Sequence, residues 1–531
     1  MQQAVLRHFP EVQAVYRFKH RDEGVFFTRR CFNLFVESVK RASPKLPIYL
    51  PNDTRNSYAQ LISYPDFHEL TISLDERDWL AGACPFFSPE YLDYLSSYRF
   101  KPSQVKATFN AKPGDDNLGR IEIEARGPWV ETILWEVPLM ACLSEIYFTT
   151  VDTDWSYDGQ VEQAYEKAKT FLGADCMFSE FGTRRRRSFH AQDLVVSTLV
   201  RASKELAEKG KFMGTSNVHL AWKHQVLPIG TIAHEWYMAI GALKGYEHVN
   251  GVALDIWENV YPNSLLLALT DTFSTEAFYK DFVSDKARAE RWKGLRQDSG
   301  DPMIYAPRAK EIYESLGIDW REKTIIFSDS LNVEKVLKLR KQCEELGFKV
   351  TFGIGTSFTN DFHSTSSGGN QKSKALNMVI KLAEVDGKPC VKISDELTKT
   401  GLLSAVVTAF AVESYQWLQE DSADASAKLL SQVSQQLASF NFAEGFKNLT
   451  IQYPSANFSP DPNDVKINML WILSLTFSLM STFFAIAVQQ WLRRIPLPEA
   501  TDDHFSVAAA GSGGSRALPC WAAAITAIPK S

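Results

Sequence analysis

The sequence predicts an α/β protein whose main part is a parallel sheet, preceded by a smaller α+β region. Between residues 174 and about 385, short apolar runs alternate with segments of helical periodicity, and such repeated units build a parallel sheet. Most Gly, Asp, Ser and Thr residues of this part fall just after a candidate strand, at the sheet edge where active-site loops gather. About seven candidate strands favour a barrel over an open sheet.

The first 130 residues mix strand and helix periodicities, and an N-terminal α/β domain over residues 1–130 is the simplest interpretation. Apolar and polar residues alternate over 14–19 and, less strongly, over 71–74, while 121–125 is a strand that enters a Gly-Pro turn. Apolar residues at helical spacing predict helices over 87–98 and 130–147.

Residues 131–400 are expected to form the barrel-like catalytic domain. Its candidate strands are 177–180, 212–214, 226–229, 265–271, 294–298, 324–328 and 350–353. Its candidate helices are 193–209, 232–243, 306–316 and 333–346.

The character of the chain changes at residue 401, and residues 401–495 are expected to form a membrane domain. Residues 401–418 have the length of a membrane span but contain Glu413. Residues 469–488 carry no charge and are followed by Trp491 and two arginines, which is typical of a transmembrane helix with a cytoplasmic C-terminus. The two candidate spans, 401–418 and 469–488, together predict a transmembrane hairpin. Residues 496–531 have the composition of a low-complexity tail.

Composition and charge exclude several classes of protein. With 531 residues and 45% hydrophobic content, the chain can bury a sizeable core, which excludes a disordered protein. The net charge of −6 gives no basic field that favours nucleic acid. The seven cysteines include no C-x-x-C pair and read as reduced intracellular thiols. Because no secretory signal pattern begins the chain, we expect a cytoplasmic catalytic region, with the C-terminal segment as its anchor.

The stretch 228–237, PIGTIAHEWY, organises the predicted site. A Gly-Thr turn follows an apolar run and leads into a helix that opens at His234, where free N–H groups suit an anion. A histidine there is often only a cap or a packed side chain. Its place three residues after Thr231, with Glu235 beside it, favours a nucleophilic or proton-transferring imidazole. An H-E-x-x-H zinc site is excluded, because Met238 stands where the second histidine would be.

A run of arginines follows the candidate strand 177–180. The segment 180–187 reads EFGTRRRR, and it is either a solvated basic loop or a binding loop in which two arginines face the mouth of the barrel. The planar fork of arginine suits carboxylates and phosphates, so this run favours an anionic substrate.

Two further segments suit an anionic, sugar-containing substrate. RQDSGD (296–301) is either a helix-capping network or a set in which Arg296 binds an acid group while Asp298 and Asp301 bind sugar hydroxyls or hydrated Mg²⁺. FGIGTSFTND (352–361) is a glycine-rich turn that can close around a phosphate, although it is neither a Walker A loop nor a full G-x-G-x-x-G.

Together these motifs resemble the nicotinate phosphoribosyltransferase family. EFGTRRRR, GTSNVHLA (214–221), GTIAHEW, RQDSGD, FSDSLN (327–332) and FGIGTSFTND occur in the family's order and spacing, and the resemblance covers about residues 1–397. It implies a type II phosphoribosyltransferase fold, an α/β domain beside an irregular barrel, in a homodimer. It also implies that nicotinate and phosphoribosyl pyrophosphate give nicotinate mononucleotide and pyrophosphate, with coupled ATP hydrolysis and Mg²⁺.

The resemblance also implies roles for individual residues. His234 occupies the position of the histidine that becomes phosphorylated. Thr231 and Arg296 match residues that contact nicotinate, and Thr356 matches a contact to phosphoribosyl pyrophosphate. The positions that line the same cavity with less specific roles are Arg184, Ser216, Asp298 and Gly355.

Two features depart from the family pattern. Family members usually have an upstream segment resembling D-x-Y-K-x-T-M, whose tyrosine stacks on the pyridine ring, whereas this chain starts at MQQAVLRHFP. After residues 391–400 the chain enters a stretch, through QWLRR, that is similar to a domain of unknown function in fungal membrane proteins. The alternatives are therefore an inactive membrane-anchored fusion or a misjoined chain, and, within the enzyme class, a nicotinamide or quinolinate phosphoribosyltransferase.

Overall fold

The computed structural model describes residues 1–22, 24–40, 67, 70–206, 209–395, 466 and 469. The described residues up to 395 belong to one compact unit. The expected hairpin over 401–418 and 469–488, apart from Met469, and the tail 496–531 lie outside the described residues. Within the described residues, no helix combines the length and the apolar character that a membrane crossing needs.

One of the two main sheets is antiparallel and brings the two ends of the described chain together. Its strand order is β15-β14-β1-β4-β2, and β3 pairs with β4 along residues 115–125. Strand β4 alternates as the sequence predicts: Ile121 and Ile123 are buried, whereas Glu122 and Glu124 face outward. The strands are β1 (Gln13–His20), β2 (Phe27–Thr28), β3 (Val105–Lys112), β4 (Asp115–Pro128), β14 (Met378–Val385) and β15 (Lys388–Pro389).

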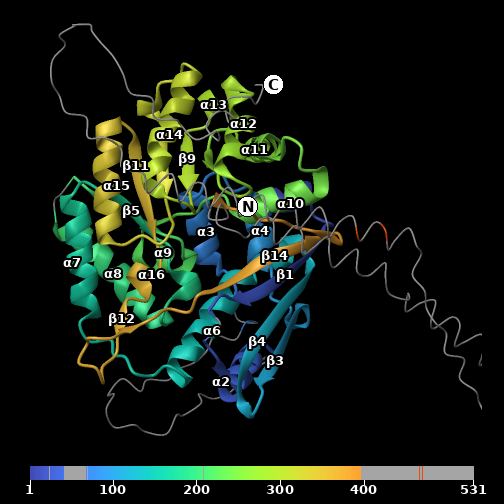
Figure 1. Ribbon diagram of the computed structural model, residues 1–531, viewed down its shortest axis with the longest axis vertical. Coiled ribbons are helices and arrows are strands. Elements are labelled where there is room, and N and C mark those ends of the chain that lie inside the picture. Colours follow the sequence, from blue (N-terminus) through green and yellow to red (C-terminus); the bar gives the residue numbers. More distant parts are fainter. Residues whose placement is uncertain are drawn as a thin grey trace, which may run out of the picture. The chain divides into compact units, whose positions relative to one another are not determined.

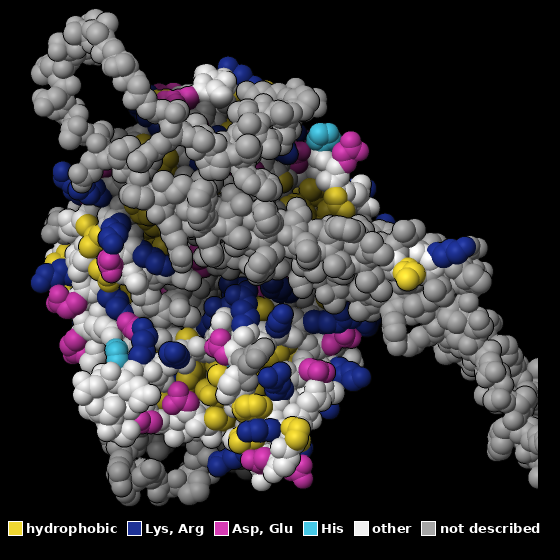
Figure 2. Space-filling view, in the orientation of Figure 1, with side chains coloured by type: hydrophobic (Ala, Val, Ile, Leu, Met, Phe, Trp, Pro, Cys, Tyr) yellow, Lys and Arg dark blue, Asp and Glu magenta, His cyan; other side chains and the backbone are white. Residues whose placement is uncertain are grey.

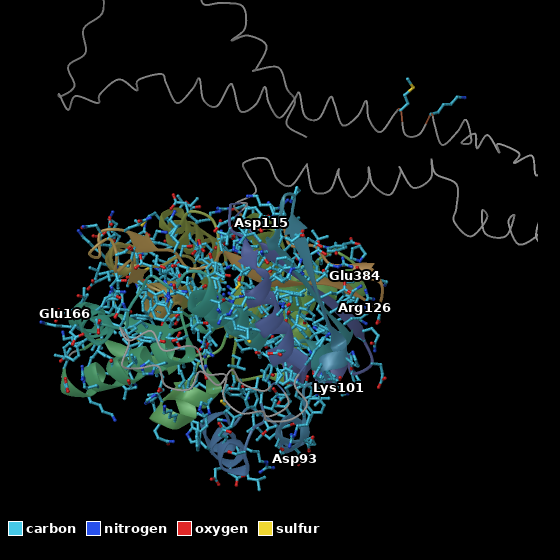
Figure 3. All side chains as sticks on the ribbon, turned by 90° about the horizontal axis from the view of Figure 1, so that it is seen from below. Asp93, Lys101, Asp115, Arg126, Glu166 and Glu384 are labelled. Carbon is cyan, nitrogen blue, oxygen red and sulfur yellow. The ribbon has the colours of Figure 1, made fainter. Side chains whose placement is uncertain are left out.

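The outer face of this sheet carries a charge ladder across three strands. Arg17 of β1 contacts Glu124 of β4 at 3.1 Å and Glu384 of β14 at 2.5 Å. Figure 3 shows Glu384 and Arg126, the neighbour of Glu124, on the same side of the molecule. These ion pairs are partly exposed, so they should contribute little to the stability of the fold. The division of the chain at residue 130 stays a prediction, because one hydrophobic core runs through both parts.

The other main sheet has seven parallel strands in the order β7-β6-β5-β11-β10-β9-β8, and every one of them lies within or overlaps a predicted strand. This confirms an α/β fold with a curled parallel sheet. The edge strands β7 and β8 are not paired with each other, so the barrel is irregular and hydrogen bonding does not close it. The strands are β5 (Met177–Glu180), β6 (Lys211–Thr215), β7 (Leu227–Pro228), β8 (Leu267–Leu269), β9 (Gly294–Gln297), β10 (Thr324–Phe327) and β11 (Lys349–Ile354).

Helices cover the outside of the parallel sheet. Figure 1 shows α7, α8 and α15 beside β5 and β11, with the antiparallel sheet below and to the right. A short hairpin of β12 (Phe362–His363) and β13 (Lys372–Ser373) follows the last parallel strand. The helices are α1 (Gln2–His8), α2 (Arg29–Lys40), α3 (Leu74–Ala83), α4 (Pro89–Ser97), α5 (Trp129–Thr132), α6 (Glu136–Thr150), α7 (Gln160–Gly173), α8 (Phe189–Glu205), α9 (Val218–His224), α10 (His234–Lys244), α11 (Val249–Val260), α12 (Thr275–Val283), α13 (Lys286–Arg291), α14 (Pro302–Ser315), α15 (Val333–Leu346) and α16 (Thr356–Thr359).

Two local predictions in the N-terminal region are wrong, and each has a physical reason. The long helix over 130–147 is divided into α5 and α6, because Pro138 in a helix interior would clash with the preceding turn, whereas the first turn of α6 tolerates it. The alternation over 71–74 does not form a strand. Ser73 instead caps α3 reciprocally with Glu76, and this capping box starts a helix.

Candidate active site

His234 lies at the start of α10, where the sequence predicts it. The loop that leads to it is attached to the sheet, because the Ile229 N–H donates to the Thr215 carbonyl of β6. Trp236, two residues further, is fully buried and donates its indole N–H to the Ala253 carbonyl at 2.9 Å. These contacts fix the first turn of the helix and hold the His234 imidazole among side chains from the loops after β8 and β9.

The imidazole is held at both nitrogens. His234 Nε2 lies 3.0 Å from Asp298 Oδ2, and Nδ1 lies 3.1 Å from the Thr272 hydroxyl. Because an ionised carboxylate can only accept a hydrogen bond, Nε2 carries the proton, and Nδ1 keeps its lone pair and accepts from Thr272. Burial lowers the pKa of His234 to about 4 against the opposing effect of Asp298, so the ring is neutral at pH 7.

Arg296, near the carboxyl end of β9, and Asp298, just after it, form one hydrogen-bond network with the loop before His234. The Arg296 guanidinium donates to the Thr231 hydroxyl at 2.8 Å and to Asp298 Oδ1 at 2.8 Å. It also donates to the Ile232 carbonyl and to the Ser328 hydroxyl beyond β10. Burial would raise the pKa of Asp298, but Arg296 and His234 hold it well below its usual range. The loop after β7 and the ends of β9 and β10 are thereby joined at one edge.

Asp271, just beyond β8, belongs to the same edge and was not among the predicted site residues. It is fully buried, its Oδ2 accepts a short hydrogen bond from the Ser299 hydroxyl, and its Oδ1 has no hydrogen-bond partner in the described structure. Burial and the neighbouring Asp298 raise its pKa to about 6. The sequence signal was a carboxylate at the end of the predicted strand 265–271, in the position where site residues gather.

Replacing Asp271 with asparagine is expected to stabilise the fold above pH 6. Between about pH 4 and pH 6 the folded state holds the Asp271 proton that the unfolded state has lost, so wild-type stability falls as the pH rises through this window. The loss is about 3 kcal/mol above pH 6, because each unit of pKa shift corresponds to about 1.4 kcal/mol. Thermal unfolding should give the variant a higher Tm at pH 8 and an equal Tm near pH 4, and a Tm difference that does not change with pH would contradict this.

The four arginines of EFGTRRRR divide into two pairs. Arg186 and Arg187 are buried: Arg187 donates to Ser373 at 2.9 Å and lies over the Phe148 ring at 3.6 Å, so it attaches the β12-β13 hairpin to the core. Arg184 and Arg185 reach solvent. Arg184 pairs with Glu136 at 2.8 Å, and this carboxylate raises the pKa of Arg184. Two of the four arginines, Arg184 and Arg185, thus remain accessible to solvent, and their binding of an anion stays a prediction.

The glycine-rich segment 352–361 packs directly against the arginine loop. The Phe181 N–H donates to the Ile354 carbonyl at 2.7 Å, and the Thr359 hydroxyl donates to the Gly182 carbonyl at 3.1 Å. A Cβ on Gly182 would lie 2.1 Å from the Thr359 hydroxyl oxygen, so only glycine allows this approach. Gly355 and Thr356 therefore lie beside the loop that carries Arg184 and Arg185. Ser216, exposed just beyond β6, joins it through its backbone N–H to the Glu180 carbonyl.

A cluster of cations near this edge was missed by the sequence analysis. The cluster consists of Lys19, Arg21, Lys381 and Lys392. Partial desolvation of the Lys381 ammonium group and the positive charges of the other three side chains lower the pKa of Lys381 to about 8. Lys392 is carried there because the Ile393 N–H donates to the Thr272 carbonyl at 2.9 Å. Figure 2 shows Lys and Arg side chains gathered near the centre of this face. The pairing of β1 with β14 brings Lys19 and Lys381 together although they lie far apart in the sequence.

Comparisons with known families agree with this architecture. Residues 176–444 match the nicotinate phosphoribosyltransferase (NAPRTase) family, and residues 57–144 match the NAPRTase N-terminal domain. Residues 393–510 match a family of unknown function, DUF6535, in the region where the sequence resembles a domain of unknown function.

Individual relatives extend over most of the chain. A protein named "Probable nicotinate phosphoribosyltransferase" from Schizosaccharomyces pombe is 37% identical over 77% of this chain and 93% of its own length. Nicotinate phosphoribosyltransferase from Saccharomyces cerevisiae is 38% identical over 75% and 88%. The crystal structure of nicotinate phosphoribosyltransferase from Porphyromonas gingivalis superposes with a TM-score of 0.63 at 32% identity, covering 74% of this chain and 91% of that one. The chain belongs to the nicotinate phosphoribosyltransferase family.

Proposed function

We propose that this protein is a nicotinate phosphoribosyltransferase coupled to ATP. In this reaction the pyridine nitrogen of nicotinate bonds to the anomeric carbon of phosphoribosyl pyrophosphate, and the bond from that carbon to pyrophosphate breaks. ATP is hydrolysed to ADP and phosphate in the same cycle. The observation that carries the proposal is the buried network of His234, Asp298, Arg296 and Thr231, set in a fold whose relatives bear this name.

The Arg296 and Thr231 pair supports recognition of the nicotinate carboxylate. The hydrogen bonds of Arg296 use four of the five guanidinium N–H groups, which leaves one for a ligand. The Thr231 hydroxyl accepts from Arg296 and keeps its own proton to donate. A carboxylate can accept from both groups at once, whereas a neutral amide lacks the second anionic oxygen.

His234 is proposed to accept the γ-phosphate of ATP on Nδ1. The lone pair on Nδ1 attacks the γ-phosphorus, the bond to the ADP oxygen breaks, and Asp298 keeps the ring oriented through the Nε2 proton. The added negative charge beside Arg296 and the cation cluster would change the affinity for the substrate anions. Water then releases the phosphate from the histidine.

The cation cluster and the loop 353–356 support binding of phosphoribosyl pyrophosphate. Lys381, Lys392 and Arg21 supply positive charge for the diphosphate, and carboxylates near the ribose can stabilise the cationic character of its anomeric carbon. Among the described residues, no group of three or more acidic, His or Cys side chains is arranged to hold a metal alone. Asp271, with its free buried oxygen, fits as one ligand of a Mg²⁺ that neutralises the diphosphate, with phosphate and water oxygens as the others.

Two further properties belong to this proposal. Like the family it belongs to, the chain is proposed to act as a homodimer, and a monomer mass in sedimentation equilibrium would contradict this. The uncharged run 469–488 is proposed to associate the protein with membranes. Recovery of all the full-length protein in the supernatant after high-speed centrifugation, without detergent, would count against the anchor.

The direct test is pyrophosphate release by the whole chain with nicotinate, nicotinamide or quinolinate, each with phosphoribosyl pyrophosphate, ATP and Mg²⁺. We expect kcat/KM for nicotinate to exceed that for nicotinamide on the order of a hundredfold or more, because the amide leaves the Arg296 site unpaired. A preference for nicotinamide or quinolinate would move the protein to a related activity. Silence with all three substrates would favour the inactive, membrane-anchored protein.

A further inference from the structure

Lys167 is a buried lysine that no predicted motif contains. It lies on α7 and its side chain is only 12% exposed, whereas Lys169 on the same helix is 59% exposed. Buried lysines are rare unless they are paired, because removing the ammonium charge from water is costly. The burial of Lys167 therefore needs an explanation in its contacts.

All three ammonium protons of Lys167 have acceptors. Its Nζ donates to the Ser357 carbonyl at 2.6 Å, to Asp361 Oδ2 at 2.7 Å and to Gln163 Oε1 at 3.1 Å. Because an ammonium group has three N–H donors and no acceptor, this set is complete and fixes the position of the nitrogen. Two of the three acceptors belong to the segment 352–361, almost two hundred residues away in the sequence.

Asp361 is held from two sides. Its Oδ2 accepts from Lys167 and its Oδ1 lies 2.7 Å from Lys372 Nζ, and the Lys372 side chain is 58% exposed. Burial would raise the pKa of Asp361, but the two lysines lower it. The inner pair with Lys167 is shielded from solvent, whereas the outer pair with Lys372 is exposed. Loss of Lys167 should therefore cost far more stability than loss of Lys372.

We propose that Lys167 is a positioning residue for phosphoribosyl pyrophosphate, because its ammonium group holds the segment that carries Gly355 and Thr356. Ser357, whose carbonyl it binds, directly follows these two positions. The arginine loop holds the same segment through Gly182 and Thr359, so Lys167 supplies a second, independent attachment. This inference rests on the proposed function, since it assigns the segment to that substrate.

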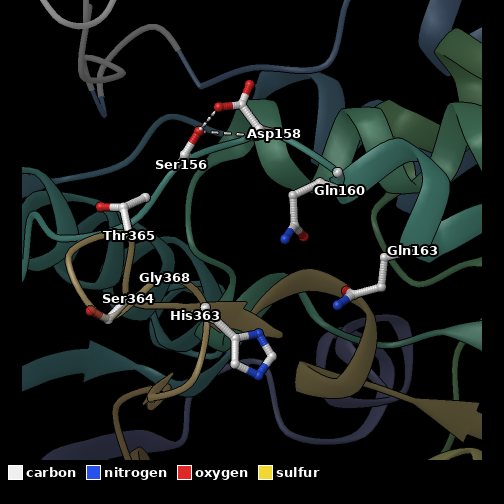
Figure 4. A pocket seen from close by; sticks show the side chains of 10 residues that line it. Ser156, Asp158, Gln160, Gln163, His363, Ser364, Thr365 and Gly368 are labelled. Atoms are coloured by element: carbon white, nitrogen blue, oxygen red, sulfur yellow. Dashed lines mark hydrogen bonds between the residues drawn. The ribbon is translucent and has the colours of Figure 1, made fainter.

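Two other contacts reach Asp361 beside Lys167: Gln160 Nε2 donates to the Asp361 carbonyl at 3.4 Å, and Lys372 Nζ lies 2.7 Å from Oδ1. Gln163, the third partner of Lys167, lines a cavity of about 470 Å³ together with Gln160 and His363. Figure 4 shows Gln160 and Gln163 directed into this cavity, with His363 across from them. A shortened side chain at position 167 would leave Asp361 Oδ2 without its inner partner and the Ser357 carbonyl without its ammonium donor.

The test compares Lys167→Met with Lys169→Met in the full chain. Substrate-induced thermal shifts are recorded with phosphoribosyl pyrophosphate and Mg²⁺, and with nicotinate, and KM values are measured for both. A misplacement of about 1 Å can cost about a hundredfold, so we expect KM for phosphoribosyl pyrophosphate to rise roughly tenfold to a hundredfold in Lys167→Met. The KM for nicotinate should stay within about twofold, and Lys169→Met should match the wild type in both.

A second variant covers the case in which Lys167→Met does not fold. Asp361→Asn keeps an oxygen for Lys167 but removes the charge, and we expect a several-fold rise in the same KM with the nicotinate KM unchanged. An unchanged affinity for phosphoribosyl pyrophosphate in a folded variant would overturn the proposal, as would equal losses for both substrates. The thermal shift needs no turnover, so a wild type that binds phosphoribosyl pyrophosphate but forms no product would contradict the proposed function and not the role of Lys167.

Discussion

Replacing Arg296 with methionine is expected to lower kcat/KM for nicotinate by about 10²- to 10³-fold. The change removes the proposed carboxylate ligand and leaves Asp298 buried without its strongest partner. Truncating one partner of a buried, hydrogen-bonded charge pair between protein and ligand costs about 2–5 kcal/mol of binding free energy, and each 1.4 kcal/mol is about tenfold in affinity. Steady-state kinetics with varied nicotinate measures the effect, and most of it should appear in KM because the lost contact is made in the ground state.

Two comparisons make this result specific. Arg308 is exposed and pairs with Glu276 and Glu311, so Arg308→Met should change the kinetics by less than about twofold. Arg296→Lys should recover little activity, because a single ammonium group cannot make the four hydrogen bonds of the guanidinium fork. If Arg296→Met kept KM and kcat for nicotinate near their wild-type values, the assignment of the carboxylate site would be wrong.

Replacing His234 with alanine is expected to uncouple the reaction from ATP. Without Nδ1 the chain has no proposed acceptor for the γ-phosphate, so ADP release should fall by at least about 10²-fold. Nicotinate mononucleotide formation should continue slowly and should no longer respond to ATP. His224→Ala is the matched control, because that histidine pairs with Asp193 outside this network. Full ATP stimulation in His234→Ala would contradict the role of His234.

The pH dependence of the same step follows from the environment of His234. Its pKa in the folded protein is lowered to about 4 by burial, below the usual value near 6.5. The imidazole stays neutral as the pH falls from 7 to 5. The ATP-dependent rate should therefore show no decrease near pH 6.5 that is due to protonation of His234. The unfolded state takes up the proton first, and His234 therefore makes the fold less stable as the pH falls from about 6.5 to 4.

The positions of the parallel strands could be predicted from sequence because each is a short apolar run bounded by polar turns. The strand predicted at 177–180 and the helix predicted at 333–346 have the bounds observed for β5 and α15. The motif residues after these strands meet because all parallel strands end at the same edge. The rule placed Thr231, Arg296 and Asp298 at one edge before their side-chain contacts were known.

The parts that could not be predicted depend on contacts between distant segments. The pairing of β1 with β14 places Lys381 next to Arg17. No local sequence pattern predicts a pairing between strands that lie so far apart in the sequence. The cation cluster and the Lys167 contact to Ser357 have the same origin. The division between α5 and α6 had a local signal in Pro138, but the apolar pattern across it outweighed that signal.

The most direct test of the account is the conversion of ring-labelled nicotinate by the full 531-residue chain. The label is followed by chromatography in the presence of phosphoribosyl pyrophosphate and Mg²⁺, with and without ATP. The account predicts that the label moves into nicotinate mononucleotide, with one pyrophosphate per nucleotide and a faster conversion when ATP is present. Label that stays in free nicotinate, in a folded protein that binds phosphoribosyl pyrophosphate, would contradict it.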